Sequence, residues 1–316
     1  MVKQSRDNQI KVNNRKKIVL FFFLLQITCG FSQNHLNSFL KPADSLNKSR
    51  RTTVIVSELG VTAVALVGLN QLRYADYPKS SFHTIKDNAE WLQMDKVGHV
   101  FSSYQLGSFG ANTLKWSGAS RKSQLLYGAT LGFVFLTSVE IMDGYSSQWG
   151  FSYGDLAANA GGTVLYVSQE LLWKEQRILP KFSFHTTVYP SARPYVLGSS
   201  LSEQVFKDYN GQTYWLSTNL HSFFKGSKIP KWLNLAVGYG AEGMIIGSDD
   251  VVNTVFFPEK ERTRQFYLSF DADLTKIKTK SPLLKTVFAV FNTIKIPAPT
   301  IEISSSRGIK FHYLYF

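Results

Sequence analysis

Three short polar clusters lie at the margins of consecutive apolar stretches in the first half of the chain. They contain carboxylates, an imidazole, an ammonium group and an amide, from Asp95, Lys96, His99, Glu140, Asp143, Asp155 and Asn159. Carboxylates and an imidazole can together hold a divalent cation, and a carboxylate can also orient a histidine as a general base. These residue types predict a metal site or acid–base chemistry, but they do not specify a reaction.

The spacing within each cluster places its members together. Asp95 and His99 are four positions apart, and Glu140 and Asp143 are three apart. Residues at these separations share one face of a helix. Each pair is therefore expected to point to one side of its own helix.

Each side chain suggests a role. The candidates for acid–base chemistry are His99, Asp95 and Glu140; the candidate cation ligands are Asp143, Asp155 and His99; the candidates for binding a substrate are Lys96, Asn159 and Trp149. Asp155 also suits the N-cap of a following helix, a role that needs no chemistry. Lys96 can simply neutralise a buried carboxylate. The alternative is thus a non-catalytic component in which the polar cluster only fixes helix packing.

Four apolar stretches must position these side chains, at residues 53–72, 97–114, 124–142 and 155–173. The connections between them are short, which favours antiparallel neighbours. In that topology the three polar clusters meet at one end of a four-helix antiparallel bundle. Gly128 and Gly132 add a small-residue ridge that permits close helix contact.

The second half changes character and predicts an antiparallel β region, so that the fold class is α+β. The candidate strands are residues 182–189, 213–222, 232–246, 264–274, 300–304 and 309–316, and residues 285–294 can form an amphipathic helix. Alternation places Phe266, Leu268 and Phe270 on one face of a strand. The aromatic terminal strand resembles the last strand of an outer-membrane barrel. About six strands are fewer than the eight of the smallest such barrels, so a partial or complete barrel and a half-covered open sheet both remain possible.

The N-terminus has the pattern of a secretory signal peptide. Basic residues precede the apolar run 18–25, and a small-residue stretch ends near Ser32. Cys29, the only cysteine, lies in this leader, so disulfides and cysteine-based sites are excluded after cleavage. The expected segments are a signal peptide at 1–32, a flexible lead-in at 33–52, the helical bundle at 53–178 and the β region at 179–316.

Composition and charge indicate the cell envelope. Apolar residues make up 44% of the chain, and it contains 24 Phe and 15 Tyr. The net charge of +13 becomes +8 without the leader, which carries six Lys/Arg and one Asp. Dispersed positive charge on an exported protein favours membrane lipid or an envelope glycolipid as partner, and not nucleic acid. We expect an exported protein of the outer membrane or periplasm. The cofactor is left open by the sequence, with a divalent cation as the candidate.

The order of the polar residues also resembles known envelope families. The matching pattern is Asp95-Lys96-x-x-His99, Glu140-x-x-Asp143-Gly144 and Trp149-Gly150-Phe151-Ser152-x-x-Asp155, followed by Asn159 and Gly162. It is similar to the YfiM-like family of uncharacterised bacterial envelope proteins, and more distantly to VanZ-like membrane proteins. The resemblance covers about residues 90–170 and implies a periplasmic or lipoprotein location without supplying an activity.

Overall fold

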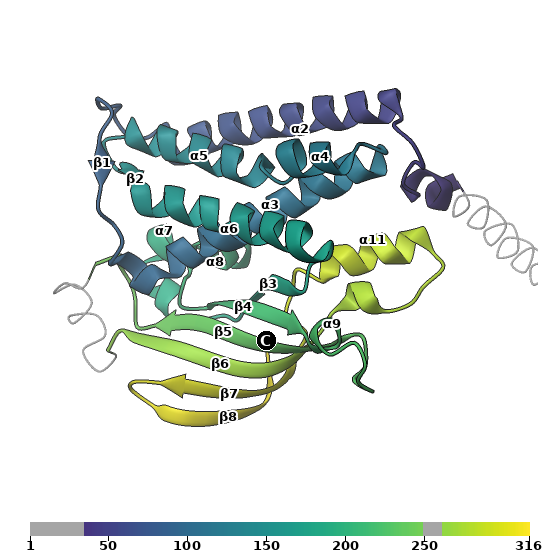
Figure 1. The fold of residues 1–316 in the computed structure, drawn as a ribbon. Coiled ribbons are helices and arrows are strands. Elements are labelled where there is room, and N and C mark those ends of the chain that lie inside the picture. Colours follow the sequence, from purple (N-terminus) through teal and green to yellow (C-terminus); the bar gives the residue numbers. More distant parts are fainter. Residues whose placement is uncertain (1–34, 249–260) are drawn as a thin grey trace, which may run out of the picture.

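The structure is a computed structural model that describes residues 35–248 and 261–316. The expected signal peptide, with Cys29, lies outside the described residues. A layer of helices covers one side of an antiparallel sheet (Figure 1). This mixture of helices and sheet agrees with the predicted α+β class.

The helical layer follows the four apolar stretches. It consists of α2 (Lys48–Leu69), continued by a π-helical turn (Asn70–Tyr74), α3 (Met94–Trp116), α4 (Arg121–Ser123) with a second π-helical turn (Gln124–Gly128), α5 (Leu131–Gly144) and α6 (Tyr153–Trp173). A short parallel ladder joins β1 (Thr84–Ile85) to β2 (Phe151–Ser152), just before α6. The N-cap of α6 is Ser152, whose hydroxyl accepts the Asp155 N–H at 3.1 Å, and not Asp155 as expected. Asp155 therefore lies in the first turn with its carboxylate available for other contacts.

Close backbone contact fixes the positions of α3, α5 and α6. A Cβ atom at Gly132 of α5 would lie 2.2 Å from the Ser103 carbonyl oxygen of α3, and one at Gly162 of α6 would lie 2.3 Å from the Val100 carbonyl oxygen. Only glycine fits at such distances. The expected small-residue ridge of α5 therefore makes the close contact with α3 that the sequence predicts. The helix α2 differs, because it leaves Val56, Leu59 and other apolar side chains exposed.

Two helical segments, Lys48–Tyr74 and Arg121–Gly144, have the length and apolar composition to cross a membrane. Two such segments are weak grounds for a membrane topology, because core helices meet the same criterion.

The segment expected to be a flexible lead-in is ordered from residue 35 onwards. Residues 35–40 are helical, and the Trp116 indole N–H donates to the Phe39 carbonyl oxygen at 2.6 Å. The Arg50 guanidinium lies 4.5 Å above the Trp116 ring. These contacts tie the segment to the end of α3, and α2 begins at Lys48, before the expected residue 53.

All six expected strands are present and form one sheet. They are β3 (Ile178–Phe184), β4 (Gln212–Asn219), β5 (Leu233–Glu242), β6 (Thr263–Ala272), β7 (Ala298–Ser304) and β8 (Gly308–Tyr315). Each strand pairs antiparallel with the next in chain order. The connections carry α7 (Pro194–Leu197), α8 (Leu201–Lys207), α9 (Leu220–Phe223) and the expected amphipathic helix, α11 (Pro282–Phe291).

The sheet is curled but does not close into a barrel. Its end strands, β3 and β8, do not pair with each other in the described part of the chain. The outer edge of β3 is instead taken by a later segment, since Phe182 N–H donates to the Thr293 carbonyl and Lys295 N–H to the Phe182 carbonyl, both at 2.9 Å. The expectation of a complete barrel is therefore wrong, and the open sheet is observed.

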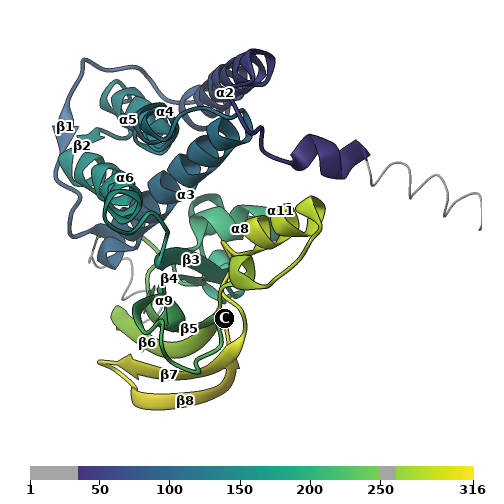
Figure 2. The same cartoon turned by 45° about the vertical axis from the view of Figure 1, so that its right-hand side comes forward.

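Helix α3 joins the two layers (Figure 2). Its Phe101 ring packs against Phe182 of β3 and Tyr214 of β4, with centroids 5.9 and 5.6 Å apart. Met94, at the start of the same helix, is fully buried in a cluster with Ala241 and Met244. The helix that carries Asp95 and His99 is thus held by the sheet on one side.

Candidate functional site

The N-termini of α3 and α6 meet the C-terminus of α5 at one end of the helical layer (Figure 1). His99 lies at the centre of this meeting point. Its Nε2 atom is 3.9 Å from Asp95 Oδ1, 3.9 Å from Glu140 Oε1 and 3.7 Å from Asp155 Oδ1. The structure thus brings together side chains from three helices, as the topology predicts.

Asn159 sets the orientation of the imidazole. Its Oδ1 atom lies 2.9 Å from His99 Nδ1, and an amide oxygen can only accept. Nδ1 therefore carries a proton that it donates to Asn159, and Nε2 faces the carboxylates. Asn159 is fully buried, and its Nδ2 atom has no hydrogen-bond partner in the described part of the chain.

Lys96 forms ion pairs with three carboxylates. Its Nζ atom lies 2.6 Å from Asp87 Oδ2, 2.8 Å from Asp155 Oδ1 and 3.5 Å from Asp95 Oδ2. The predicted role in binding substrate has no support from this geometry, because the ammonium group is committed to internal ion pairs.

Asp143 and Trp149 belong to a neighbouring cluster, and not to the group around His99. The Tyr74 hydroxyl donates to Asp143 Oδ1 at 2.7 Å, and the Arg73 guanidinium is 3.2 Å from the same carboxylate. The Trp149 ring lies 4.7 Å from that guanidinium. Asp143 and Trp149 thus both contact Arg73, and their roles as cation ligand and substrate contact stay predictions.

The cluster around His99 carries more negative charge than its own cations neutralise. Burial raises the pKa of Glu140 to about 7, and the Asp155 carboxylate contributes in the same direction. Burial likewise raises the pKa of Asp155 to about 6, with Asp95 as the second cause. Burial lowers the pKa of His99, but the carboxylates of Asp95 and Asp155 outweigh it, so that the net shift is upward. Protons are thus retained here to near-neutral pH.

Three of these side chains have the spacing of a metal-ligand set. One potential ligand atom each from Asp95, His99 and Asp155 lies within 4.8 Å of the others. Ligand atoms at about 2.1 Å from an ion lie roughly 3–4 Å apart, so a small contraction would complete the set. One imidazole nitrogen and two carboxylates suit Zn²⁺ or a similar first-row divalent ion.

Sequence reasoning missed two supporting side chains. Asp87 accepts from the Ser152 hydroxyl at 2.6 Å as well as from Lys96. It lies eight residues before Asp95 in a polar stretch, which was a usable signal. Tyr209 donates its hydroxyl to Asp95 Oδ1 from the turn before β4. Tyr209 and Asp95 are 114 positions apart, and nothing in the sequence indicates that they meet.

A strained turn sets the start of α3. Trp91, Leu92 and Gln93 have φ values of 48°, 49° and 65°, in the left-handed region that costs roughly 1–3 kcal/mol for each such residue. The sheet layer holds this turn, because the Tyr239 hydroxyl donates to the Leu92 carbonyl and the Trp91 N–H donates to the Gly247 carbonyl at 2.8 Å. Asp95 is therefore positioned by the sheet as well as by its own helix.

A cavity of about 280 Å³ adjoins the cluster. Its lining combines polar side chains, among them Asp95, His99 and Gln212, with the apolar side chains of Phe101, Leu136, Phe182, Val205 and Phe206. Phe206 is 79% exposed, so the cavity lies at the surface. A lining with both charged and apolar side chains fits an amphipathic ligand.

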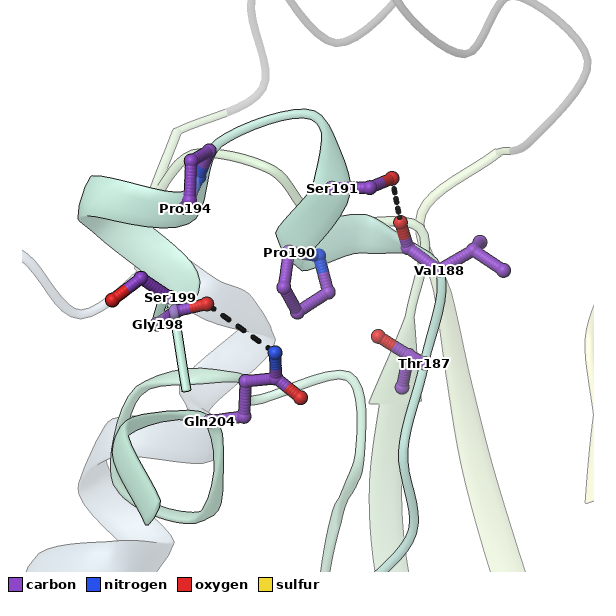
Figure 3. Close-up of a pocket in the computed structure, with 8 residues that line it drawn as sticks. All are labelled: Thr187, Val188, Pro190, Ser191, Pro194, Gly198, Ser199 and Gln204. Carbon is purple, nitrogen blue, oxygen red and sulfur yellow. Dashed lines mark hydrogen bonds between the residues drawn. The ribbon is translucent and has the colours of Figure 1, made fainter. Parts of the chain in front are cut away.

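A second hollow lies away from these residues, in the connection from β3 to β4, where residues 187–191 and α7 face α8 (Figure 3). Its lining includes Thr187, Pro190, Ser199 and Gln204 and contains no titratable side chain. The Gln204 side chain donates to the Gly198 carbonyl at 3.4 Å and partly fills it. It lacks the chemistry of the cluster, so the candidate site remains at His99.

Comparison with known proteins supports an envelope protein. Residues 85–169 match the sequence model of a family described as "Predicted periplasmic lipoprotein (DUF2279)". No curated protein and no solved structure matches the chain significantly. The matched segment contains Asp95, His99, Glu140 and Asp155, and its description supports export to the cell envelope without distinguishing outer membrane from periplasm.

Proposed function

We propose that this envelope protein binds a divalent cation through Asp95, His99 and Asp155. The orientation of His99 is the observation that carries the proposal. Asn159 Oδ1 fixes Nδ1–H at 2.9 Å, and Nε2 faces the carboxylates. Metal-ligating histidines have this arrangement, with the second ring nitrogen donating to an oxygen.

The charge balance of the site supports the same proposal. Four carboxylates, from Asp87, Asp95, Glu140 and Asp155, surround Lys96 and His99. A divalent cation would replace the protons that now offset the excess negative charge. Glu140, 3.9 Å from His99 Nε2, is then positioned as a further ligand or as a general base.

The cavity supports an amphipathic ligand for this ion. A cation held at Asp95 and His99 would attract the anionic group of a ligand whose apolar part lies along Phe101 and Phe182. Membrane lipids and lipid-linked envelope glycans share this chemistry. If the protein also catalyses a reaction of the bound ligand, His99, Asp95 and Glu140 are the proposed acid–base residues.

The second candidate function is a purely structural network. The three carboxylate contacts of Lys96 favour it, because a lysine can neutralise buried acids without any bound ion. In that case the substitution of a carboxylate would weaken the fold and leave ion binding unchanged.

Cation titration of chelator-treated protein distinguishes the two candidates. We expect one Zn²⁺ or Mn²⁺ ion per chain by calorimetry and elemental analysis, with at least 100-fold weaker binding in His99→Ala and Asp155→Asn. His83→Ala is the matched control, because His83 lies in the loop before β1 and is bonded to Ser80 and not to the cluster. Equal binding in all four proteins, or none in the wild type, would overturn the proposal.

A further inference from the structure

The strand β6 has the opposite polarity to a strand of a water-soluble sheet. Its buried side chains are polar, with Gln265, Ser269 and Asp271 at most 7% exposed. Its outward side chains are apolar, with Phe266 and Phe270 each 53% exposed. A sheet with one solvated face normally places apolar residues inward and polar ones outward.

The neighbouring strands repeat this inversion. Buried Asn234, Thr300 and Glu302 face inward from β5 and β7. The outward apolar residues form what we call the outer sheet face, and each is between 37% and 86% exposed: Leu216, Leu235, Val237, Phe266, Leu268, Phe270, Ile301, Ile303, Ile309, Phe311 and Tyr313.

These side chains form a continuous surface, because they are partners across the strands. Leu268 of β6 lies opposite Val237 of β5 and Ile301 of β7. Ile301 in turn lies opposite Phe311 of β8. Nothing in the described part of the chain covers this surface from β5 to β8. On the same face, α3 covers only Phe182 and Tyr214, at the β3–β4 edge of the sheet. Contiguous apolar surfaces of this kind mark contact with a membrane or a protein.

The loops at one end of the strands supply positive charge. The β4–β5 and β6–β7 connections leave the sheet at the same end, near α9 and α11 in Figure 1. They carry six exposed lysines, Lys225, Lys228, Lys231, Lys278, Lys280 and Lys285. Exposed Phe223, Phe224 and Trp232 lie among them. Aromatic and lysine side chains together are typical of the boundary between hydrocarbon and headgroups.

We propose that the outer sheet face rests on an anionic lipid bilayer, with the six lysines of the adjoining loops on its phosphate groups. The apolar residues supply the area that leaves water, and the lysines determine the preference for negative charge. Among the described residues no strand pairs with the outer edge of β8, which argues for adsorption and not for insertion, because hydrocarbon cannot satisfy backbone groups left unpaired there. This inference does not rest on cation binding at His99.

Vesicle flotation with a site-specific probe tests the contact. In a Cys29→Ser background, Leu268→Cys on the outer sheet face carries an environment-sensitive fluorophore, and exposed Ser199→Cys carries it in the control. Vesicles of phosphatidylglycerol and phosphatidylcholine should bind at least tenfold more tightly than phosphatidylcholine alone. The probe at 268 should shift to the blue on binding, and the probe at 199 should not.

Charge reversal tests the lysines separately. Each lysine near an anionic surface contributes about fivefold to affinity, so Lys225→Glu, Lys228→Glu and Lys231→Glu together should weaken binding by roughly 100-fold. The matched control reverses Lys79, Lys122 and Lys207, which are exposed elsewhere, and should lose far less.

Two outcomes would overturn the proposal. Vesicle binding without a shift at 268 would assign the contact to another surface, such as the exposed apolar side of α2. A shift at 268 that depends on protein concentration and needs no vesicles would assign the outer sheet face to a second copy of the chain. Neither outcome changes the cation titration, so the two proposals fail separately.

Discussion

Buried charge is handled differently in the sheet and at the helix ends. Inside the sheet, Lys181 Nζ lies 2.8 Å from Asp271 Oδ2, and both side chains are fully buried. Lys295, also fully buried, donates instead to the carbonyl oxygens of Phe270 and Ile296. The sheet thus satisfies its buried ammonium groups with one close carboxylate and with backbone oxygens.

At the helix ends, Glu140 and Asp155 are also buried, but four carboxylates share one lysine and one histidine. The carboxylates there outnumber the cationic side chains, and this excess of negative charge favours the binding of an added cation.

The largest expected effect comes from breaking the matched pair. Lys181→Met leaves Asp271 buried without its cation, so we expect the free energy of unfolding to fall by about 3–5 kcal/mol in urea denaturation. The double variant Lys181→Met with Asp271→Leu should recover most of this loss, because it removes both charges. A single variant as stable as the wild type would show that the pair is not needed.

Acidification should weaken cation binding at the unmatched cluster. A cation bound to His99 and Asp155 must displace their protons, and its charge also favours the ionised form of neighbouring Glu140. The pKa is about 7 for Glu140 and about 6 for Asp155. Both groups are ionised at pH 8 and protonated at pH 5.5, so affinity should fall by roughly 100-fold over this range. Calorimetric titration at several pH values measures the slope. Affinity that is constant with pH would contradict a site made of these carboxylates.

Removing one charge from the cluster should stabilise the metal-free protein. Folding raises the pKa of Glu140 from 4.5 to about 7, so its ionised form opposes folding fully above pH 7 and not at all below pH 4.5. Glu140→Gln should therefore gain about 1–3 kcal/mol at pH 8 in chelator and nothing at pH 4.5. Glu203→Gln, on exposed α8, is the control. A loss of stability at pH 8 would favour the structural network.

The smallest expected effect concerns the contact from the sheet to the cluster. Tyr209→Phe removes the hydroxyl that donates to Asp95, and supporting partners of metal ligands contribute about tenfold to affinity at this level. Tyr214→Phe is the matched control, because its hydroxyl donates to Gln212 at 2.9 Å and not to a carboxylate. Equal cation affinities in both variants would remove Tyr209 from the site.

The local parts of this comparison could be predicted from the sequence. Apolar stretches and short connections were enough to bring His99, Glu140 and Asp155 together, because helix ends must meet where loops are short. All six strands followed from alternation and turn residues. The buried face of the sheet did not, since alternation puts Phe266 and Phe270 on one side without saying whether that side faces protein or surroundings.

The non-local parts could not be predicted. Tyr209 reaches Asp95 only because the sheet packs on α3. The left-handed turn before α3 contains no glycine, the residue that would have indicated positive φ values in the sequence. Tertiary contacts impose its conformation. The separation of Asp143 from the cluster depends on Arg73 and Tyr74, whose direction is fixed by the end of α2.

The left-handed turn at Trp91–Gln93 also bears on whether the helical layer can work without the sheet. The segment that matches the family model, residues 85–169, contains the proposed ligands Asp95, His99 and Asp155 but not Tyr209 and Tyr239, which contact the start of α3. A fragment cut to those bounds would keep the proposed ligands. It would lose the hydrogen bonds that Tyr239 donates to the Leu92 carbonyl and Tyr209 donates to Asp95. The matched segment is therefore shorter than the structural unit that sets the position of Asp95, because residues of the sheet layer hold the turn before α3.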